Sequence, residues 1–223
     1  MHEHVPSLSF ALALVAGFLI VSLGAEEAEA QRFQKKWLNI GEYQSYYSSG
    51  GIEPRRNPRE GEQWPASDPN MHHFVRKALW VRVANWTDTD GETWNNKISH
   101  VGPRVQGENE VWPMEFELRA KYGEPEVSVD GLQSFHKPVF NQSIDRIVPN
   151  MKADRMIYNR LNALHGIQIE RKVHAFSNQF HDQYHIWEYT FTNTGNVDGD
   201  EEIEKPDQTL DGVLFHFRHK YTI

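Results

Sequence analysis

The chain has 223 residues, no cysteine and a formal net charge of −8 at pH 7. An acidic chain lacks the basic patch that neutralises phosphates, so the composition argues against a nucleic-acid partner. Without cysteine, disulfides, thiol catalysis and Cys-ligated zinc are excluded. The fold must therefore be stabilised by its core, by assembly or by bound ions.

The first thirty residues have the features of an export signal. Residues 10–25 form an uncharged apolar run, and Ala28-Glu29-Ala30 supplies the small residues that signal peptidase requires. The run is shorter than the roughly 20 residues of a spanning helix. We therefore expect residues 1–30 to be a signal peptide, cleaved before Gln31, and the protein to be secreted or at the cell surface with no membrane span. No Lys or Arg precedes the run, so a buried helix of a soluble domain is the alternative.

The next segment, residues 31–74, is predicted to be rich in loops. Residues 50–70 read GGIEPRRNPREGEQWPASDPN, and their four prolines and charged cluster predict a long loop. Residues 33–47 are one of two stretches that could be helical. The other, residues 150–164, reads equally well as a loop that leads into a strand near Arg155.

Residues 75–223 have the period of two that is typical of strands. Three sets of residues each share one predicted face: Leu79, Val81 and Val83; Met114, Phe116 and Leu118; Ile167, Ile169 and Arg171. Asp-Gly pairs at 90–91, 130–131 and 211–212 predict hairpin turns. The sequence therefore predicts an all-β fold after the signal peptide, an antiparallel β-sandwich of Ig-like or similar topology. It stops inside a predicted strand, so we expect it to be the N-terminal part of a longer protein.

Two resemblances accompany this pattern. The stretch HIWEYTFTNTGN, residues 185–196, resembles the strand and turn of Ig-like modules repeated in large bacterial surface proteins. The series GEQWPASDPN, KALWVRVANWTD and VHAFSNQFHDQYHIWEYTFTNTGNVDGD resembles the N-terminal region of large uncharacterised secreted bacterial proteins, some of which end in a type IX secretion sorting domain. This resemblance implies an exported β-rich region of unassigned activity and supplies no catalytic residues.

The segment DTDGETWNN offers a candidate calcium site. Asp88, Asp90 and Glu92 alternate beside a glycine, which gives the oxygen-rich turn that calcium needs. The EF-hand pattern is incomplete, because Ser99 stands where a bidentate Glu is required, and a hairpin turn with solvated acids is the alternative. The same two interpretations apply to the acidic run at residues 198–202. We therefore expect no cofactor, and calcium is the alternative.

Histidine and tryptophan supply two further hypotheses. His181 and His185 are too far apart on a strand to bind one zinc ion, although on a helix they could. Trp64 and Trp86 stand beside polar or turn-forming residues, so we expect them to be exposed and able to stack on sugar rings. The alternative is that the tryptophans belong to the core or form cross-strand pairs, as we expect for Trp80, Trp112 and Trp187.

The sequence contains no motif of a known reaction. It lacks G-x-S-x-G, H-E-x-x-H and a Gly-rich phosphate loop, so an enzyme would require a further domain. We expect a secreted or cell-surface protein region with a structural or adhesive role. The alternative is a carbohydrate-binding module of an extracellular polysaccharide-degrading enzyme. The expected partners are other extracellular domains or glycans.

Overall fold

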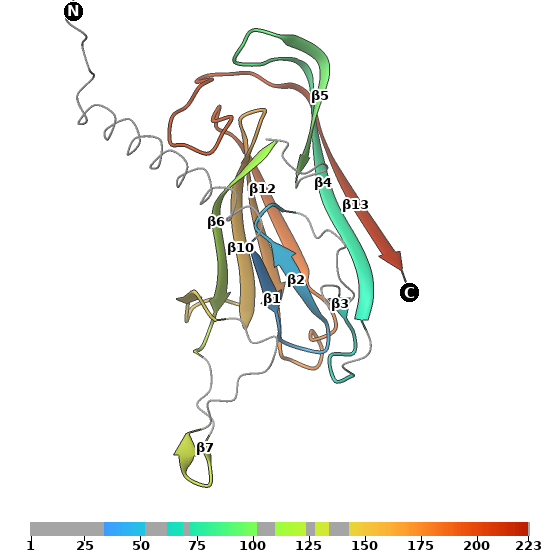
Figure 1. The fold of residues 1–223 in the computed structure, drawn as a ribbon, viewed down its shortest axis with the longest axis vertical. Helices are drawn as coiled ribbons and strands as arrows, with labels where there is room; N and C mark the ends of the chain where they lie inside the picture. The colour runs from blue at the N-terminus through green and yellow to red at the C-terminus, as the bar shows by residue number, and fades with distance from the viewer. Residues whose placement is uncertain are drawn as a thin grey trace, which may run out of the picture.

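The computed structural model describes residues 34–51, 62–68, 72–101, 110–123, 128–133 and 143–222. Over these residues the chain is all-β, as predicted, and its strands form two large sheets and a small hairpin (Figure 1). Every described strand pair is antiparallel except β6 with β9. The described residues contain no helix that is long and apolar enough to cross a membrane. The predicted signal peptide lies outside them.

The first sheet is built around one long strand. Its order is β1-β2-β3-β4-β13, and β5 also pairs with β4. The bounds of these strands are β1 (Lys35–Leu38), β2 (Gln44–Ser48), β3 (Glu62–Gln63), β4 (His72–Thr87), β5 (Thr93–Val101) and β13 (Asp211–Thr222). Because β4 is 16 residues long, it pairs with β3 near its start and with β5 near its end.

The second sheet has the order β12-β11-β10-β6-β9. Its strands are β6 (Val111–Ala120), β9 (Arg146–Ile147), β10 (Arg155–Ala163), β11 (Ile167–Ala175) and β12 (Ile186–Asn193). The hairpin of β7 (Ser128–Val129) and β8 (Leu132–Gln133) lies away from both sheets (Figure 1). Asp130 and Gly131 turn this hairpin with φ of 52° and 79°, which confirms the turn predicted there.

The two sheets pack face to face in a sandwich-like arrangement. Leu79, Val81 and Val83 of β4 are each at most 1 % exposed, which confirms their predicted common face. They form one core cluster with residues of β6, β10 and β11, among them Leu161 and Ile169. Burial of these aliphatic side chains stabilises the fold by roughly 1.5–3 kcal/mol for each fully buried residue.

The N-terminal segment forms strands, so the helix considered at residues 33–47 is wrong. Leu38 of β1 and Tyr47 of β2 are fully buried in a second core cluster with Leu118, Ile157 and Val173. In this cluster β1 and β2 cover the part of the second sheet that β4 and β5 do not cover. Two short strands with adjacent buried tyrosines lack the alternation that reveals a strand in a sequence. The helix considered at residues 150–164 is also wrong, since β10 begins at Arg155.

One predicted turn is wrong. Asp211 and Gly212 lie inside β13, where the pairing with β4 shifts register between Asp211 and Leu214. Gly212 has a φ of 54°, and the extra residue makes a β-bulge. An Asp-Gly pair supplies the positive φ of either a hairpin turn or a bulge, so the sequence could not distinguish them.

The sandwich is open along one side. Within the described residues, β12 pairs with β11 alone and β13 with β4 alone, so both strands are sheet edges. Their inward side chains face each other across what we call the β12–β13 seam: Trp187, Tyr189 and Phe191 against His219, Phe217 and Phe215. Phe217 is 45 % exposed, and the three β12 residues are half-buried. The core is therefore incompletely covered at this seam.

Candidate functional site

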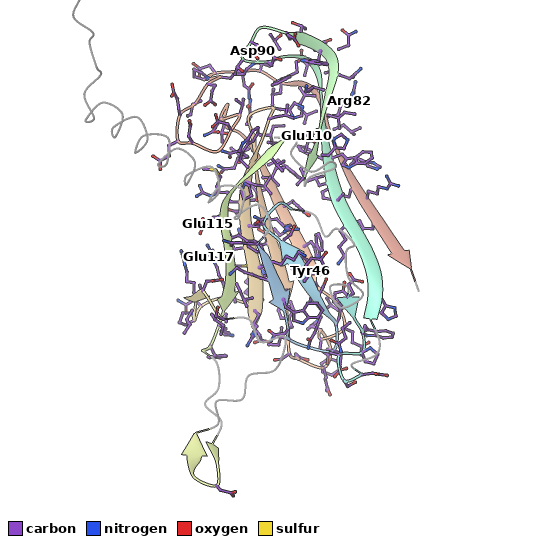
Figure 2. All side chains as sticks on the ribbon, in the orientation of Figure 1. Tyr46, Arg82, Asp90, Glu110, Glu115 and Glu117 are labelled. Atoms are coloured by element: carbon purple, nitrogen blue, oxygen red, sulfur yellow. The ribbon has the colours of Figure 1, made fainter. Side chains whose placement is uncertain are left out.

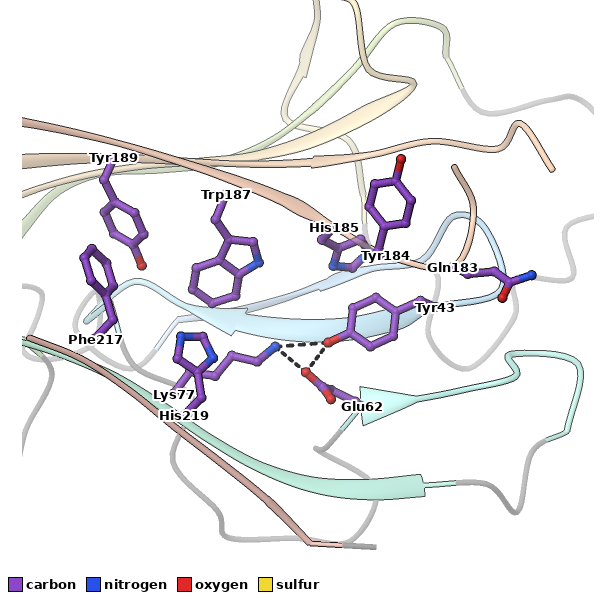
Figure 3. Close-up of a pocket in the computed structure, with 10 residues that line it drawn as sticks. All are labelled: Tyr43, Glu62, Lys77, Gln183, Tyr184, His185, Trp187, Tyr189, Phe217 and His219. Atoms are coloured by element: carbon purple, nitrogen blue, oxygen red, sulfur yellow. Dashed lines mark hydrogen bonds and ion pairs between the residues drawn. The ribbon is translucent and has the colours of Figure 1, made fainter. Parts of the chain in front are cut away.

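A cavity of about 530 Å³ opens at one end of the β12–β13 seam (Figure 3). Five parts of the chain meet around it: the β1–β2 loop, β3, β4, the loop before β12 with β12 itself, and β13. Its lining consists of Tyr43, Glu62, Lys77, Gln183, Tyr184, His185, Trp187, Tyr189, Phe217 and His219. Within the first sheet, the cavity lies between the part formed by β4 and β13 and the part formed by β1 and β2.

A buried ion pair forms one side of the cavity. Glu62 of β3 and Lys77 of β4 are in direct contact, and their side chains are 5 % and 4 % exposed. The Tyr43 hydroxyl donates to Glu62 and accepts a hydrogen bond of 3.1 Å from Lys77 Nζ. Figure 3 shows these three groups converging on one point. Opposite charges and hydrogen bonds together offset the cost of removing both ions from water.

Aromatic rings form the facing side. The Tyr189 ring lies 5.1 Å from the Phe217 ring, and the Trp187 ring lies 5.9 Å from the His219 ring. Lys77 Nζ is 5.0 Å from the Trp187 ring centroid, within the range of a cation–π contact. The cavity therefore combines apolar ring surface with a charged hydrogen-bonding cluster.

His185 lies at the back of the cavity. Its Nδ1 is 2.7 Å from the Tyr47 hydroxyl, and its ring lies 4.6 Å from the Tyr43 ring. Burial, together with the nearby positive charge of Lys77, lowers the pKa of His185 to about 3. The imidazole is thus neutral at pH 7. Its Nε2 is buried and has no hydrogen-bond partner in the described part of the chain.

The loop before β12 is held in place by the β1–β2 loop. The backbone amide of Tyr43 donates to the Asp182 carbonyl at 2.9 Å. Ser177 donates from both its amide and its hydroxyl to the Asp154 carboxylate, at 2.8 and 2.9 Å. These contacts anchor the loop at Ser177 and Asp182, immediately before the cavity residues 183–185.

The two predicted sugar-stacking tryptophans have different surroundings. Trp64 follows β3 and is 46 % exposed, as expected. Trp86 is 7 % exposed and belongs to the core, so the expectation that it is exposed is wrong. It packs 5.3 Å from the buried His165 ring and carries Lys205 Nζ 4.9 Å from its ring centroid. Neither tryptophan lines the cavity.

Among the described residues, the predicted calcium ligands Asp88, Asp90 and Glu92 belong to no group of three that could hold a metal ion. The Asp88 carboxylate accepts the backbone amides of Asp90 and Glu92 at 3.0 and 2.8 Å, so it stabilises the β4–β5 turn. Desolvation acts to raise the pKa of Asp88, but these amides and the Trp94 indole outweigh it and lower that pKa. Figure 2 shows Asp90 at the tip of this hairpin, away from the sheets.

A different acidic group does come together among the described residues. Carboxylate oxygens of Asp198, Asp200 and Glu204 lie within 4.8 Å of one another. The first two belong to the acidic run considered for calcium in the sequence. Each of the three carboxylates already accepts a backbone amide of the same loop. The arrangement has the oxygen ligands that calcium prefers, and it also serves as the scaffold of the loop.

The two histidines considered for zinc lie in a loop and not on a strand. The His181 ring nitrogen contacts the Tyr184 hydroxyl, whereas His185 contacts Tyr47. No group of three ligands that includes either histidine is found within the described residues.

The central residues of the cavity, Glu62 and Lys77, were not predicted from the sequence. Glu62 lies in a segment whose prolines indicated a loop, and β3 is two residues long. Lys77 stands in an alternating strand, on the same face as the buried Leu79. A lysine on the predicted apolar face of β4 was the one signal that could have drawn attention to this site, because lysine is almost never buried unless it is paired.

Comparison of the chain with protein-family models, curated proteins and solved structures found no match. The resemblances described above therefore stay predictions, and the interpretation of the site depends on its own geometry.

This geometry suits a polyhydroxylated ligand. Aromatic faces can stack on the apolar side of a sugar ring, and the Glu62–Lys77–Tyr43 cluster offers both donors and acceptors for hydroxyl groups. A concave apolar surface with a few convergent polar groups is the usual composition of a ligand site.

Proposed function

We propose that this chain is an exported, adhesion-type β-sandwich region that binds carbohydrate at the open end of the β12–β13 seam. The observation that carries the proposal is the cavity in which Trp187, Tyr189 and Phe217 lie opposite the buried Glu62–Lys77 pair. The ligand would stack on the rings and exchange hydrogen bonds with the charged cluster. The adhesive role and the carbohydrate-binding role predicted from the sequence then belong to one surface.

Binding is a better proposal than hydrolysis for this cavity. Glycoside hydrolysis generally uses a pair of carboxylates that flank the scissile bond. Of the described lining residues, Glu62 alone has a carboxylate, and that carboxylate is already in contact with Lys77 and Tyr43. The cavity thus offers recognition groups without a second carboxylate for general acid catalysis.

The test is a binding screen with the full chain. Tryptophan emission is recorded while cello-, xylo-, manno- and galacto-oligosaccharides are added, because Trp187 lines the cavity. At least one series is expected to shift the emission. Replacement Phe217→Ala should weaken that binding about tenfold by removing a stacking surface. The matched control Leu214→Ala changes a 55 % exposed residue of the same strand outside the cavity, and it should bind normally. No shift with any series would refute the proposal.

A second candidate function is assembly through strand edges. It is favoured by the edge position of β13, which has 12 residues and is bonded on one side over almost its whole length within the described residues. Exposed strand edges pair readily with strands of other chains. The chain would then associate with itself or with a neighbouring extracellular domain. Analytical ultracentrifugation over a wide concentration range tests self-association, which Leu214→Lys should reduce; a monomer at every concentration would contradict it.

Export and Ig-like topology complete the proposal. Export is supported by the apolar run and the Ala-x-Ala site in residues 1–30. N-terminal sequencing of the protein recovered outside the cell should give Gln31, and an intact Met1 would refute cleavage. The Ig-like assignment is supported by two facing sheets whose strands are antiparallel except for β6 with β9. An experimental structure whose strand connectivity differs from that of an Ig-like fold would refute this assignment.

A further inference from the structure

A second cavity lies farther along the same seam. It has a volume of about 480 Å³ and is separate from the cavity at Glu62 and Lys77. Its lining consists of Ile167, Phe191, Asn193, Gln208, Thr209, Leu210, Val213 and Phe215. Like the first cavity, it is bounded by β12 on one side and β13 on the other.

The two cavities are neighbours along an aromatic row. Tyr189 of the first cavity stacks parallel to Phe191 of the second, with ring centroids 5.9 Å apart. Phe191 and Phe215 stack across the seam with ring centroids 3.8 Å apart, and both line the second cavity. A ligand that extends beyond the first cavity past Tyr189 would therefore meet this ring pair and the second cavity.

The second cavity also contains polar groups that are held in fixed positions. Gln208 Nε2 donates to Asn193 Oδ1 and to the His165 carbonyl, each at 2.8 Å. Asn193 Nδ2 donates in return to the Gln208 carbonyl at 2.8 Å. Amide side chains fixed in this way retain further donor and acceptor capacity, which suits uncharged hydroxyl groups.

We propose that this second cavity is a further saccharide subsite, so that the ligand is a linear chain of several sugar residues lying along the seam. This inference rests on the proposed function. From Trp187 to Asn193 the seam extends for about 20 Å at the rise of a β-strand, which is longer than one sugar ring. The saccharide binds with one sugar unit beside Glu62 and Lys77, passes the Phe191–Phe215 ring pair and ends beside Asn193 and Gln208.

The test measures, with the full protein chain, how the binding affinity depends on the length of the saccharide. Cello-, xylo- and manno-oligosaccharides are titrated calorimetrically as mono-, di-, tetra- and hexasaccharides. The affinity is expected to rise at least about tenfold from the disaccharide to the longest member of the series that binds, because the second subsite adds contacts without a second loss of translational freedom.

Matched variants show whether the gain in affinity of longer saccharides depends on the second cavity. Val213 is 36 % exposed and lines the second cavity, so Val213→Arg fills that cavity from its rim. This variant should bind the disaccharide normally and lose the gain of the longer chains. The control Leu214→Arg introduces the same side chain one residue away, outside both cavities, and should keep the gain.

Each outcome is decisive. A length-dependent gain that Val213→Arg removes and Leu214→Arg keeps supports the second subsite. Equal affinity for the disaccharide and all longer members overturns it while the carbohydrate-binding function stands. No binding of any saccharide overturns both proposals. A gain that persists in Val213→Arg also overturns the second subsite, because the additional contacts would then lie elsewhere.

Discussion

The Glu62–Lys77 pair places two opposite charges where water has little access. Such a pair is costly to desolvate, and its stability depends on both partners being present. Tyr43 adds hydrogen bonds to both groups, and the rings of Tyr47 and Trp187 lie 5.6 and 5.0 Å from Lys77 Nζ. We therefore infer that the cavity keeps its shape in the absence of ligand.

This ion pair leads to a stability prediction. Replacement Glu62→Gln removes one charge and leaves the Lys77 ammonium buried, so it should lower the free energy of unfolding by about 3–5 kcal/mol. The double variant Glu62→Gln with Lys77→Met removes both charges and should recover much of that loss. Urea denaturation at neutral pH measures both changes.

A matched control separates burial from pairing. Glu188 pairs with Lys172 at 3.5 Å, but its side chain is 55 % exposed. Glu188→Gln should therefore change the free energy of unfolding by less than about 1 kcal/mol. If Glu62→Gln costs no more than this control, the buried pair does not have the role assigned to it.

The buried His165 predicts a loss of stability in acid. This residue is fully buried, and burial lowers its pKa to about 4, while Lys97 contributes opposing smaller effects. In the unfolded chain the same group titrates near 6.5. Between these values the unfolded state binds a proton that the folded state does not bind, so stability falls as the pH decreases from about 6.5 to 4. The total loss is on the order of 3 kcal/mol.

Variants at two histidines test whether His165 causes the predicted fall in stability with decreasing pH. In His165→Leu the side chain no longer titrates, so urea unfolding between neutral pH and about pH 4.5 should depend less steeply on pH than in the natural chain. His216→Asn changes an exposed histidine and should keep the original slope. An unchanged slope in His165→Leu would show that another group causes the acid sensitivity. His185, whose pKa is lowered to about 3, acts in the same direction.

Among the elements, the connection after β12 depends on one glycine. Gly195 has a φ of 77°, and a Cβ there would clash with the Lys205 carbonyl oxygen. The Gly195 amide donates to the Gly166 carbonyl at 3.0 Å, and its own carbonyl accepts the Lys205 amide at 3.1 Å. This residue therefore joins the β10–β11 turn to the acidic loop.

The prediction for this connection compares two glycines of similar backbone conformation. Gly91 has a φ of 86°, and a methyl group added there would meet no other group within 4 Å, so Gly91→Ala should cost about 1–2 kcal/mol for the backbone alone. Gly195→Ala should cost roughly 2 kcal/mol more, because the added methyl group contacts the Lys205 backbone. Chemical denaturation of the two variants measures this difference, and equal losses would contradict the close packing at Gly195.

The strands differ in how far the sequence predicts them. Long strands with one buried face have clear alternation, and Ile167, Ile169 and Arg171 of β11 are all buried as their common face requires. Arg171 is accommodated because it donates to the Ser48 carbonyl at 2.8 Å and to Asn159 at 3.1 Å. Ser48 lies on β2, 123 residues away in the sequence, so this partner cannot be read from a local pattern.

The candidate site is predictable only in part for the same reason. The aromatic strand that supplies Trp187 and Tyr189 was visible in the sequence, but Trp187 was expected in the core or in a cross-strand pair, and sugar stacking was predicted for Trp64 and Trp86 instead. The predicted stacking residue Trp86 is buried in the core cluster instead, because Asn85, with a φ of 49°, interrupts the alternation that puts Leu79, Val81 and Val83 on one face. Glu62 and Lys77 meet through the pairing of β3 with β4, which short strands in a proline-rich segment do not reveal.

For the molecule as a whole, the incomplete cover of the core is what creates the candidate site. The two sheets bury the β4, β10 and β11 side chains between them, whereas the aromatic rings of the two edge strands stay half-exposed. Apolar surface at an open edge is costly unless a ligand or partner covers it. Carbohydrate binding and strand addition are two ways to cover this seam, and they predict different partners for the same residues.

Saccharide binding at the β12–β13 seam, as proposed here, can be followed residue by residue. The most direct measurement is an NMR titration of the full chain with the oligosaccharide series, following each backbone amide. We expect the largest shift changes in residues 183–193 and 213–219, with little change at Glu115 and Glu117, which lie on β6 in the second sheet (Figure 2). Shift changes centred on β6, or none with any saccharide, would contradict this proposal.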